Sequence, residues 1–366
     1  MTPVEPKETT INTPIKTPWG VDAEGRPVYR IIGPRPEWLA LVREEALEPA
    51  LPIIDPHHHF WDHHGNYFLD ELLADLSSGH RVLGTVYLQC GHAYDTAATP
   101  ELQPVGETAF AAGIAREAER RPDAPKVCAG IVAYADMMLG DAVRPVLDAH
   151  VKAGDGRMRG IRHITALHEG FSASLLGRPR AGLMADPGFR RGLAVLQSMG
   201  LSFDAWLYHT QIGELTDLAR AMPELKIVLD HLGGPIGVGP YTGRRDDSRR
   251  ECLDALAVLA ACPNVHLKLG GLSMTMIGFD YQERASPPDS QELAQAWKPY
   301  IEPAIEMFGA RRCMFESNFP VDSAVCSYRV QWNAFKRITA QASADDKAWL
   351  YAGTADRFYR LGLCPQ

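Results

Sequence analysis

The chain has 366 residues, of which 46% are hydrophobic and 22% charged, so it is long enough to bury a large core. Its formal net charge is -8, and two aspartates interrupt its densest basic run, residues 243–250, which argues against nucleic acid or an anionic membrane surface as a partner. No apolar run approaches the roughly 18 residues that span a bilayer, and the N-terminal segment lacks the apolar stretch of a signal peptide, so we expect a soluble, cytoplasmic protein.

The N-terminal part of the sequence differs from the rest. Residues 1 to about 35 are rich in Pro, Thr and Gly and lack periodicity, which is typical of an irregular arm. After Pro36, the segment 36–50 has apolar residues at helical spacing and predicts a helix. We therefore expect residues 1–50 to form an arm and a helix that pack on a domain of residues 51–366.

Short apolar runs recur through this larger domain. They lie at residues 51–55, 82–90, 126–134, 158–165, 201–209, 225–231, 264–270 and 312–317. Segments of helical period lie between these runs and after the last one. Strands that are apolar on both faces and alternate with helices are typical of a parallel sheet. Eight such units predict an α/β fold, a closed (β/α)8 TIM barrel.

The irregular segments are unevenly distributed. Long ones follow predicted strands at 91–106, 166–186, 232–247 and 270–290, whereas the connections from helix back to strand are short. In (β/α)8 barrels the loops after the strands build the active face. We therefore expect functional residues at the carboxyl ends of the strands.

Four histidines lie at the carboxyl ends of three predicted strands. His57 and His59 end the first strand; being two residues apart, they point to the same side and can hold a divalent cation together, while His58 points away. His209 ends the fifth strand and His231 the sixth. A single histidine of this kind is commonly a buried structural residue, but their recurrence at strand ends favours a shared site.

Six motifs, in this order and spacing, resemble the amidohydrolase superfamily, in particular its lactonase-rich branch. They are "DPHHHFWD", "GIRH", "FDAWLYHTQ", "VLDHLGGP", "KLGGL" and "MFESNFPVD", and the resemblance runs from about residue 51 to the C-terminus. It implies a TIM-barrel hydrolase in which His57, His59 and His209 surround a divalent metal such as zinc or manganese. It also implies that His231 polarises the substrate or handles a proton.

The eighth strand departs from the pattern of this superfamily. Where relatives commonly have an aspartate that activates water, this chain has Asn318. An amide cannot take a proton from water, so the usual base is missing at this position. The sequence therefore leaves open whether the chain binds a metal. Glu316 shares the strand parity of Asn318 and can replace the base, or it can form a structural ion pair with Lys268 or an arginine.

Further residues near predicted strand ends are candidates for substrate contacts. Arg162 and His163 end the fourth strand, where a guanidinium can clamp a carboxylate or a lactone oxygen, and Lys268 can do the same from the seventh. Pairing with a buried carboxylate is the alternative for both cations. Trp61 and Tyr208 offer aromatic surface to a flat or cyclic molecule.

Three hypotheses follow for the function. The first is hydrolysis of a lactone, from a sugar acid or from aromatic breakdown, in which His231 and Arg162 stabilise the oxyanion. The water is activated by a cation held by His57, His59 and His209, by Glu316 as base, or by both, with Asn318 as a further catalytic-site residue. The lactone preference comes from the resemblance alone. The second is non-oxidative decarboxylation of an aromatic or muconate-like acid held by Arg162. The third is a non-catalytic barrel that binds a small molecule. The expected partner is a small carboxylate or lactone, and barrels of this kind often form homo-oligomers.

Overall fold

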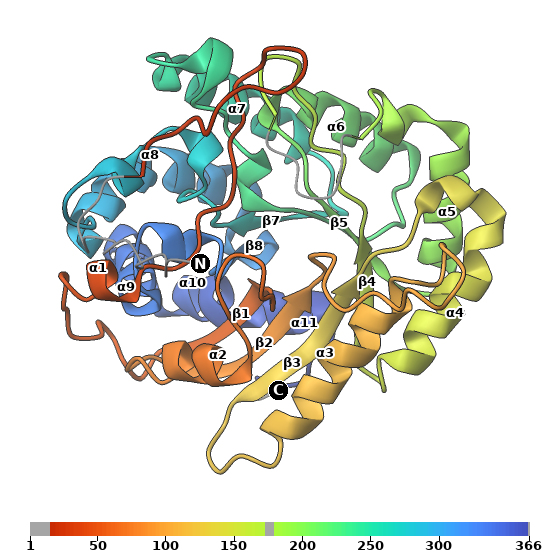
Figure 1. The fold of residues 1–366 in the computed structure, drawn as a ribbon, viewed down its shortest axis with the longest axis horizontal. Helices are drawn as coiled ribbons and strands as arrows, with labels where there is room; N and C mark the ends of the chain where they lie inside the picture. Colours follow the sequence, from red (N-terminus) through yellow and green to blue (C-terminus); the bar gives the residue numbers. More distant parts are fainter. Residues whose placement is uncertain (1–14, 173–178, 365–366) are drawn as a thin grey trace, which may run out of the picture.

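Eight parallel strands form one sheet in which each strand pairs with the next one along the chain. The structure is a computed structural model that describes residues 15–172 and 179–364. The strands are β1 (Pro52–His58), β2 (Arg81–Leu88), β3 (Lys126–Ala133), β4 (Met158–Arg162), β5 (Ser202–Ala205), β6 (Ile227–Leu229), β7 (Val265–Leu269) and β8 (Cys313–Phe315). All eight overlap the predicted runs. Figure 1 shows them arranged around a common axis, which confirms the predicted barrel.

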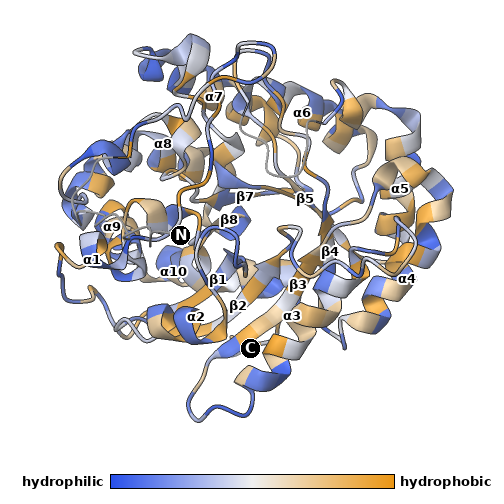
Figure 2. Cartoon of the chain, viewed as in Figure 1, coloured by the Kyte–Doolittle hydropathy of each residue, from blue (hydrophilic) through white to orange (hydrophobic). Residues whose placement is uncertain are grey.

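Helices surround this barrel and bury one face of each against it. They are α2 (Leu69–Leu76), α3 (Val105–Ala118), α4 (Arg144–Ala153), α5 (Pro187–Ser198), α6 (Ile212–Ala221), α7 (Arg245–Leu259), α8 (Ser290–Phe308) and α9 (Tyr328–Ile338). Most of them carry both hydrophobic and hydrophilic residues in Figure 2, as expected for helices with one face on the barrel. No helix in residues 15–172 and 179–364 combines the length and apolarity needed to cross a membrane.

The barrel closes where β1 meets the segment that follows β8. Asn318 N donates a hydrogen bond to His57 O at 2.9 Å, and His59 N donates to Phe319 O at 2.8 Å. These bonds hold the backbone of His57, His59 and Asn318. The pairing that closes the barrel therefore fixes the positions of their Cα atoms.

The C-terminal helices close the opposite end of the barrel. After α10 (Ala344–Ala348) and a π-helical turn (Trp349–Gly353), α11 (Thr354–Tyr359) brings Phe358 and Tyr359 against Ile54 of β1 and Val228 of β6. This apolar cluster fills the amino-terminal end of the barrel. The predicted site lies at the other end of the barrel, where the loops after the strands gather.

The predicted helix over residues 36–50 is wrong beyond its first turn. The helix α1 spans only Pro36–Leu39. The backbone groups that follow are bonded to α9 instead: Leu47 N donates to Asn333 Oδ1 at 2.8 Å, and Leu47 O accepts from Lys336 Nζ at 2.8 Å. Tertiary contacts satisfy these groups, so helical bonds are not needed there.

The N-terminal arm, residues 15–35, crosses the carboxyl end of the barrel, and it can be followed as the red trace in Figure 1. Tyr29 N donates to Ser172 O, in the loop after β4, at 2.8 Å. Thr275 Oγ1, in the loop after β7, donates to Arg30 O at 3.3 Å. The arm therefore ties together two of the loops that surround the barrel mouth.

Candidate active site

A cavity opens at the carboxyl end of the barrel beneath the N-terminal arm. Six of the residues predicted from the sequence line it: His59, Trp61, Arg162, Tyr208, His231 and Asn318. They come from five different strand ends, so the barrel brings together residues that are up to 259 positions apart in the chain. His57 and Glu316 are fully buried beneath this cavity.

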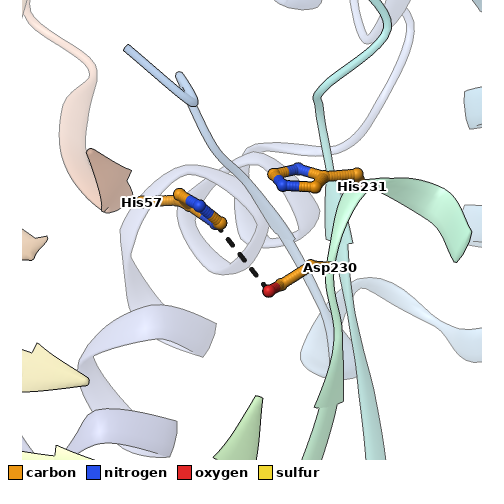
Figure 3. Close-up of side chains that lie close together, drawn as sticks. All are labelled: His57, Asp230 and His231. Atoms are coloured by element: carbon orange, nitrogen blue, oxygen red, sulfur yellow. Dashed lines mark ion pairs between the residues drawn. The ribbon is translucent and has the colours of Figure 1, made fainter. Parts of the chain in front are cut away.

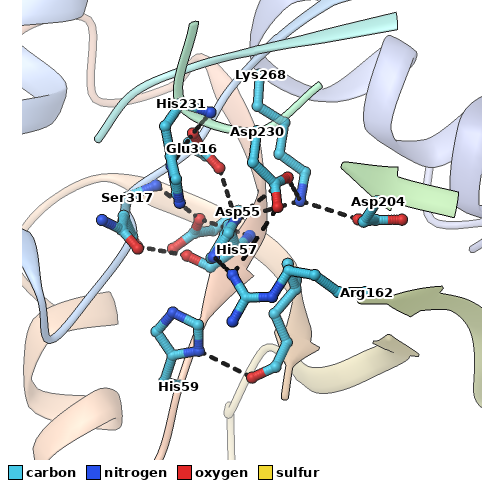
Figure 4. A network of polar contacts seen from close by, with 12 residues as sticks. Asp55, His57, His59, Arg162, Asp204, Asp230, His231, Lys268, Glu316 and Ser317 are labelled. Atoms are coloured by element: carbon cyan, nitrogen blue, oxygen red, sulfur yellow. Dashed lines mark hydrogen bonds and ion pairs between the residues drawn. The ribbon is translucent and has the colours of Figure 1, made fainter. Parts of the chain in front are cut away.

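Glu316 connects two of the predicted histidines. Its Oε2 lies 2.7 Å from His57 Nδ1, and its Oε1 lies 2.7 Å from His231 Nδ1 (Figure 4). The backbone N–H of His231 also donates to Oε1, at 3.1 Å. The chain turns immediately after β6, at His231–Gly233, which allows both the ring and the backbone of His231 to reach the same carboxylate.

The proton positions on these histidines follow from their partners. His57 Nε2 lies 3.2 Å from Arg162 Nη1, which can only donate, whereas His57 Nδ1 lies between Glu316 Oε2 at 2.7 Å and Lys268 Nζ at 3.2 Å. A hydrogen on His231 Nδ1 donates to Glu316 and leaves its Nε2 with a free lone pair. His59 donates from Nδ1 to Leu88 O at 2.8 Å. All three are neutral imidazoles in this arrangement.

Burial dominates the electrostatics of the pair formed by His231 and Glu316. It lowers the pKa of His231 to about 3, with Arg162 and Lys268 adding to the fall and Asp230 opposing it. Burial raises the pKa of Glu316 to about 8, against the attraction of Lys268. Burial therefore disfavours the charged form of both groups, and the 2.7 Å contact lets a proton pass between His231 Nδ1 and Glu316 Oε1.

A second set of buried charges lies beneath His57. Lys268 Nζ lies 2.9 Å from Asp230 Oδ1 and 3.1 Å from Asp204 Oδ2 (Figure 4). Tyr359 of α11 donates to Asp204 Oδ2 at 2.5 Å. Burial acts to lower the pKa of Lys268, but the carboxylates of Asp230, Asp204 and Glu316 raise it above its ordinary value. Lys268 is fully buried and is not among the residues that line the cavity, and its contacts correspond to the ion pair with buried carboxylates that the sequence offered as the alternative.

The profile of the amidohydrolase family matches residues 54–361. The chain belongs to the amidohydrolase family. The protein y4mH of Sinorhizobium fredii, which is uncharacterized, is 32% identical over 335 residues, covering 85% of this chain and 99% of the relative.

The chain is also similar to a lactonase and to a solved amidohydrolase structure. The L-fucono-1,5-lactonase of Burkholderia multivorans is 27% identical over 321 residues, covering 84% of this chain and 96% of the relative. A crystal structure of a Burkholderia multivorans amidohydrolase with bound zinc has a TM-score of 0.65 at 23% identity, covering 84% of this chain and 99% of that chain, and shares the fold. The superfamily expected from the sequence is confirmed, and the chain is an enzyme rather than a non-catalytic barrel.

Because amidohydrolases commonly hold a divalent metal, we tested whether the residues present fit one. One ligand atom each of His57, Asp230 and His231 lies within 4.8 Å of the others (Figure 3), the one such group in the described part of the chain. Two protein cations already lie against these donors. Arg162 Nη1 is 3.2 Å from His57 Nε2, and Lys268 Nζ is 3.2 Å from His57 Nδ1. A divalent ion among these atoms would face two positive charges in a dry interior, so the arrangement fits a metal poorly.

Two residues predicted for this amidohydrolase site lie outside it. His209 was expected as a metal ligand, but β5 ends at Ala205 and the chain turns away before His209. Its Nδ1 accepts from Ile236 N at 3.2 Å, and its Nε2 faces Glu251 at 3.7 Å. His163 follows Arg162 and therefore points outward, where its Nδ1 accepts from Met137 N at 3.3 Å.

Asn318, where the resemblance led us to expect an aspartate, lines the cavity of this amidohydrolase. Its Nδ2 donates to Asp322 Oδ1 at 2.9 Å, which orients the amide. The carbonyl oxygen Oδ1 is then the part of the amide that can accept a hydrogen bond from a ligand. Asn318 is suited to holding a water or a substrate hydroxyl, and it cannot act as a base.

Reasoning from the sequence did not identify Asp230 or Tyr359 as site residues. Asp230 directly precedes His231 and follows β6, so its place at a strand end could have marked it. Tyr359 reaches Asp204 from a helix 155 residues later in the chain, and no local pattern indicates such a contact.

Proposed function

We propose that this amidohydrolase hydrolyses a lactone, with His231 as the general base that activates water. The observation that carries the proposal is the 2.7 Å contact between His231 Nδ1 and Glu316 Oε1. A carboxylate behind an imidazole fixes its tautomer and stabilises the positive charge that forms when the other nitrogen takes a proton. The Nε2 of His231 is the nitrogen left for that task.

His231 is better placed for this role than the other basic groups. Glu316 is fully buried and does not line the cavity, so it acts on the substrate through His231. His59 lines the cavity, but its Nδ1 is bonded to the neutral Leu88 O, which stabilises an imidazolium far less than a carboxylate does. His59 is suited to orienting the water or the ring oxygen.

Arg162 supplies the positive charge that lactone hydrolysis requires. Its guanidinium is held by His57 Nε2 and by Gln89 O, and it lines the cavity. Its Nε has no hydrogen-bond partner in the described part of the chain. A fixed cation in a site shielded from water stabilises the oxyanion of a tetrahedral intermediate strongly.

The reaction then follows in two steps. Water attacks the lactone carbonyl carbon while His231 Nε2 takes its proton, and the carbonyl oxygen becomes an oxyanion beside Arg162. The intermediate collapses with cleavage of the ring carbon–oxygen bond, and the leaving oxygen takes the proton back from His231. The product is an open-chain hydroxy acid. The lactonases among the relatives support this reaction class.

Acid release from a panel of lactones, followed with a pH indicator, tests the proposal. We expect His231→Gln to lower kcat/KM by about 100-fold or more, the usual contribution of a general base, and Glu316→Gln to lower kcat with little change in KM. His92→Gln is a matched control, because His92 is half-buried outside the cavity. Carbon dioxide release from hydroxybenzoates without acid release from any lactone would contradict the proposal and show that the enzyme is a decarboxylase.

A further inference from the structure

Polar side chains gather on one part of the cavity. We call His59, Arg162, His231 and Asn318 the floor; Arg162 contacts the buried His57, and His231 contacts the buried Glu316. The remaining lining residues, which we call the walls, are mostly apolar or aromatic. They include Trp61, Trp206, Tyr208, Met274 and Met276. The cavity therefore offers a reactive polar group on one side and an apolar enclosure for the rest of the ligand.

The few hydroxyl groups of the walls are partly used within the protein. Thr275 Oγ1 donates to Arg30 O at 3.3 Å, and the Tyr29 hydroxyl faces the backbone of Gly239. Ser273 and Tyr208 are the hydroxyl-bearing residues left among the described lining residues. A sugar lactone carries a hydroxyl on most of its ring carbons, and each one needs a partner once it leaves water. Arg30 and the buried indole N–H of Trp61, which has no partner in the described part of the chain, add donors to the walls, but the walls still supply fewer partners than such a molecule needs.

The N-terminal arm contributes to the apolar enclosure. Ile31 and Ile32 line the cavity, although both lie outside residues 54–361, which match the amidohydrolase family. The backbone bonds of Tyr29 to Ser172 and of Arg30 to Thr275 hold this part of the arm in place on both sides. The arm thus adds apolar surface to the cavity that the family's barrel does not provide.

We propose that the preferred substrate is a lactone with an apolar alkyl or aryl substituent on its ring, and that polyhydroxylated sugar lactones are poor substrates. This inference rests on the proposed lactone hydrolysis. The ester group lies on the floor, where His231 and Arg162 act on it. The substituent packs against Ile31 and the two methionines, whose flexible side chains adapt to its shape.

Two six-membered lactones with different substituents test this substrate class. We expect kcat/KM for an alkyl-substituted δ-lactone to exceed that for L-fucono-1,5-lactone by at least about 100-fold, because a hydrophobic pocket discriminates by about this factor against one added hydroxyl. Ile31→Ser should lower kcat/KM for the alkyl lactone by about 10-fold and leave unsubstituted δ-valerolactone unaffected, since that ring has no substituent to bury. Val21→Ser is the matched control on the arm, because Val21 is 67% exposed.

Binding is measured separately with the corresponding lactams, whose amide ring resists hydrolysis, through the fluorescence of Trp61 and Trp206. Tighter binding of the alkyl lactam than of the polyhydroxylated lactam supports the inference. Faster hydrolysis of the sugar lactone and tighter binding of its lactam would overturn the inference and leave lactone hydrolysis standing. Tight binding of the alkyl lactam without hydrolysis of either lactone would overturn the proposed function and keep the preference of the cavity.

Discussion

Gly270 and Glu316 lie so close together that a Cβ on Gly270 would stand 2.4 Å from Glu316 Cγ and 2.6 Å from Glu316 O. The second contact is with backbone, so rotating the Glu316 side chain would not relieve it. The next residue, Gly271, has a positive φ of 68°, and a Cβ there would lie 2.6 Å from the His231 ring. This glycine pair provides the space that the His231–Glu316 pair occupies.

The substitution Gly270→Ala adds only one methyl group, but it should disturb the site strongly. We expect a loss of about 100-fold in kcat, because Glu316 must move away from His231, together with a lower free energy of unfolding. Gly213→Ala in α6 is the matched control, since nothing lies within 4 Å of a Cβ there. Activity assays and urea denaturation measure both effects. A Gly270→Ala enzyme with full activity would show that the close packing of Glu316 is not required.

Removing metal should leave the activity unchanged. Arg162 and Lys268 supply positive charge on both sides of His57, so a chelator takes away no group that the reaction needs. We expect kcat/KM to stay within about twofold after dialysis against a chelator, with metal content measured before and after. Loss of activity that added zinc restores would show that the two cations move aside for an ion.

His209→Gln should retain activity, in contrast to His231→Gln. The side chain of His209 is bonded to Ile236 N and faces Glu251, outside the cavity. We expect kcat/KM within about threefold of the unchanged enzyme and a small loss of stability from the altered hydrogen bond. A 100-fold loss of kcat/KM at unchanged stability would contradict this placement and return His209 to the site.

His150 should make the protein less stable in acid. It is fully buried, its Nδ1 pairs with Thr108 Oγ1 at 2.8 Å, and burial lowers its pKa to about 4 from an ordinary value near 6.5. A depressed folded-state pKa means that the stability from the neutral ring is complete above pH 6.5 and is lost as the pH falls toward 4. Between pH 7.5 and 4.5 this amounts to about 2 to 3 kcal/mol.

Urea denaturation at these two pH values isolates the effect of His150. Glutamine does not titrate, so the stability difference between the unchanged protein and His150→Gln should shrink by that amount at the lower pH. Other buried histidines titrate in both proteins and cancel in the difference. An equal difference at both pH values would show that His150 keeps an ordinary pKa.

The barrel could be predicted from the sequence because its signal is local. Parallel strands buried on both faces appear as short apolar runs, and the helices between them keep their period, so every predicted run overlaps a strand. The segment after Pro36 has the same kind of period and is not a helix. There the contacts of Leu47 with Asn333 and Lys336 outweigh the local preference, and these partners lie far away in the sequence.

The site could be predicted in part, for a related reason. Residues at the very end of a strand, such as His59 and Arg162, reach the cavity because strand alternation fixes their direction. His209 lies four residues beyond the end of β5, where alternation no longer applies. Strand alternation gives the side of the strand on which Lys268 lies. How far its ammonium group lies below the cavity depends on its ion pairs with Asp204 and Asp230, which cannot be inferred from spacing.

The hydrogen bond from Tyr359 to Asp204 links the buried charges to the last helix of the chain. Tyr359 lies in α11, which follows all eight strands, and Asp204 in turn lies against Lys268. The apolar residues of α11 cover the strands on this side, so the buried carboxylate and ammonium groups are kept from water there. A substitution in α11 can therefore alter the charges beneath the active site from the end of the barrel opposite to the cavity.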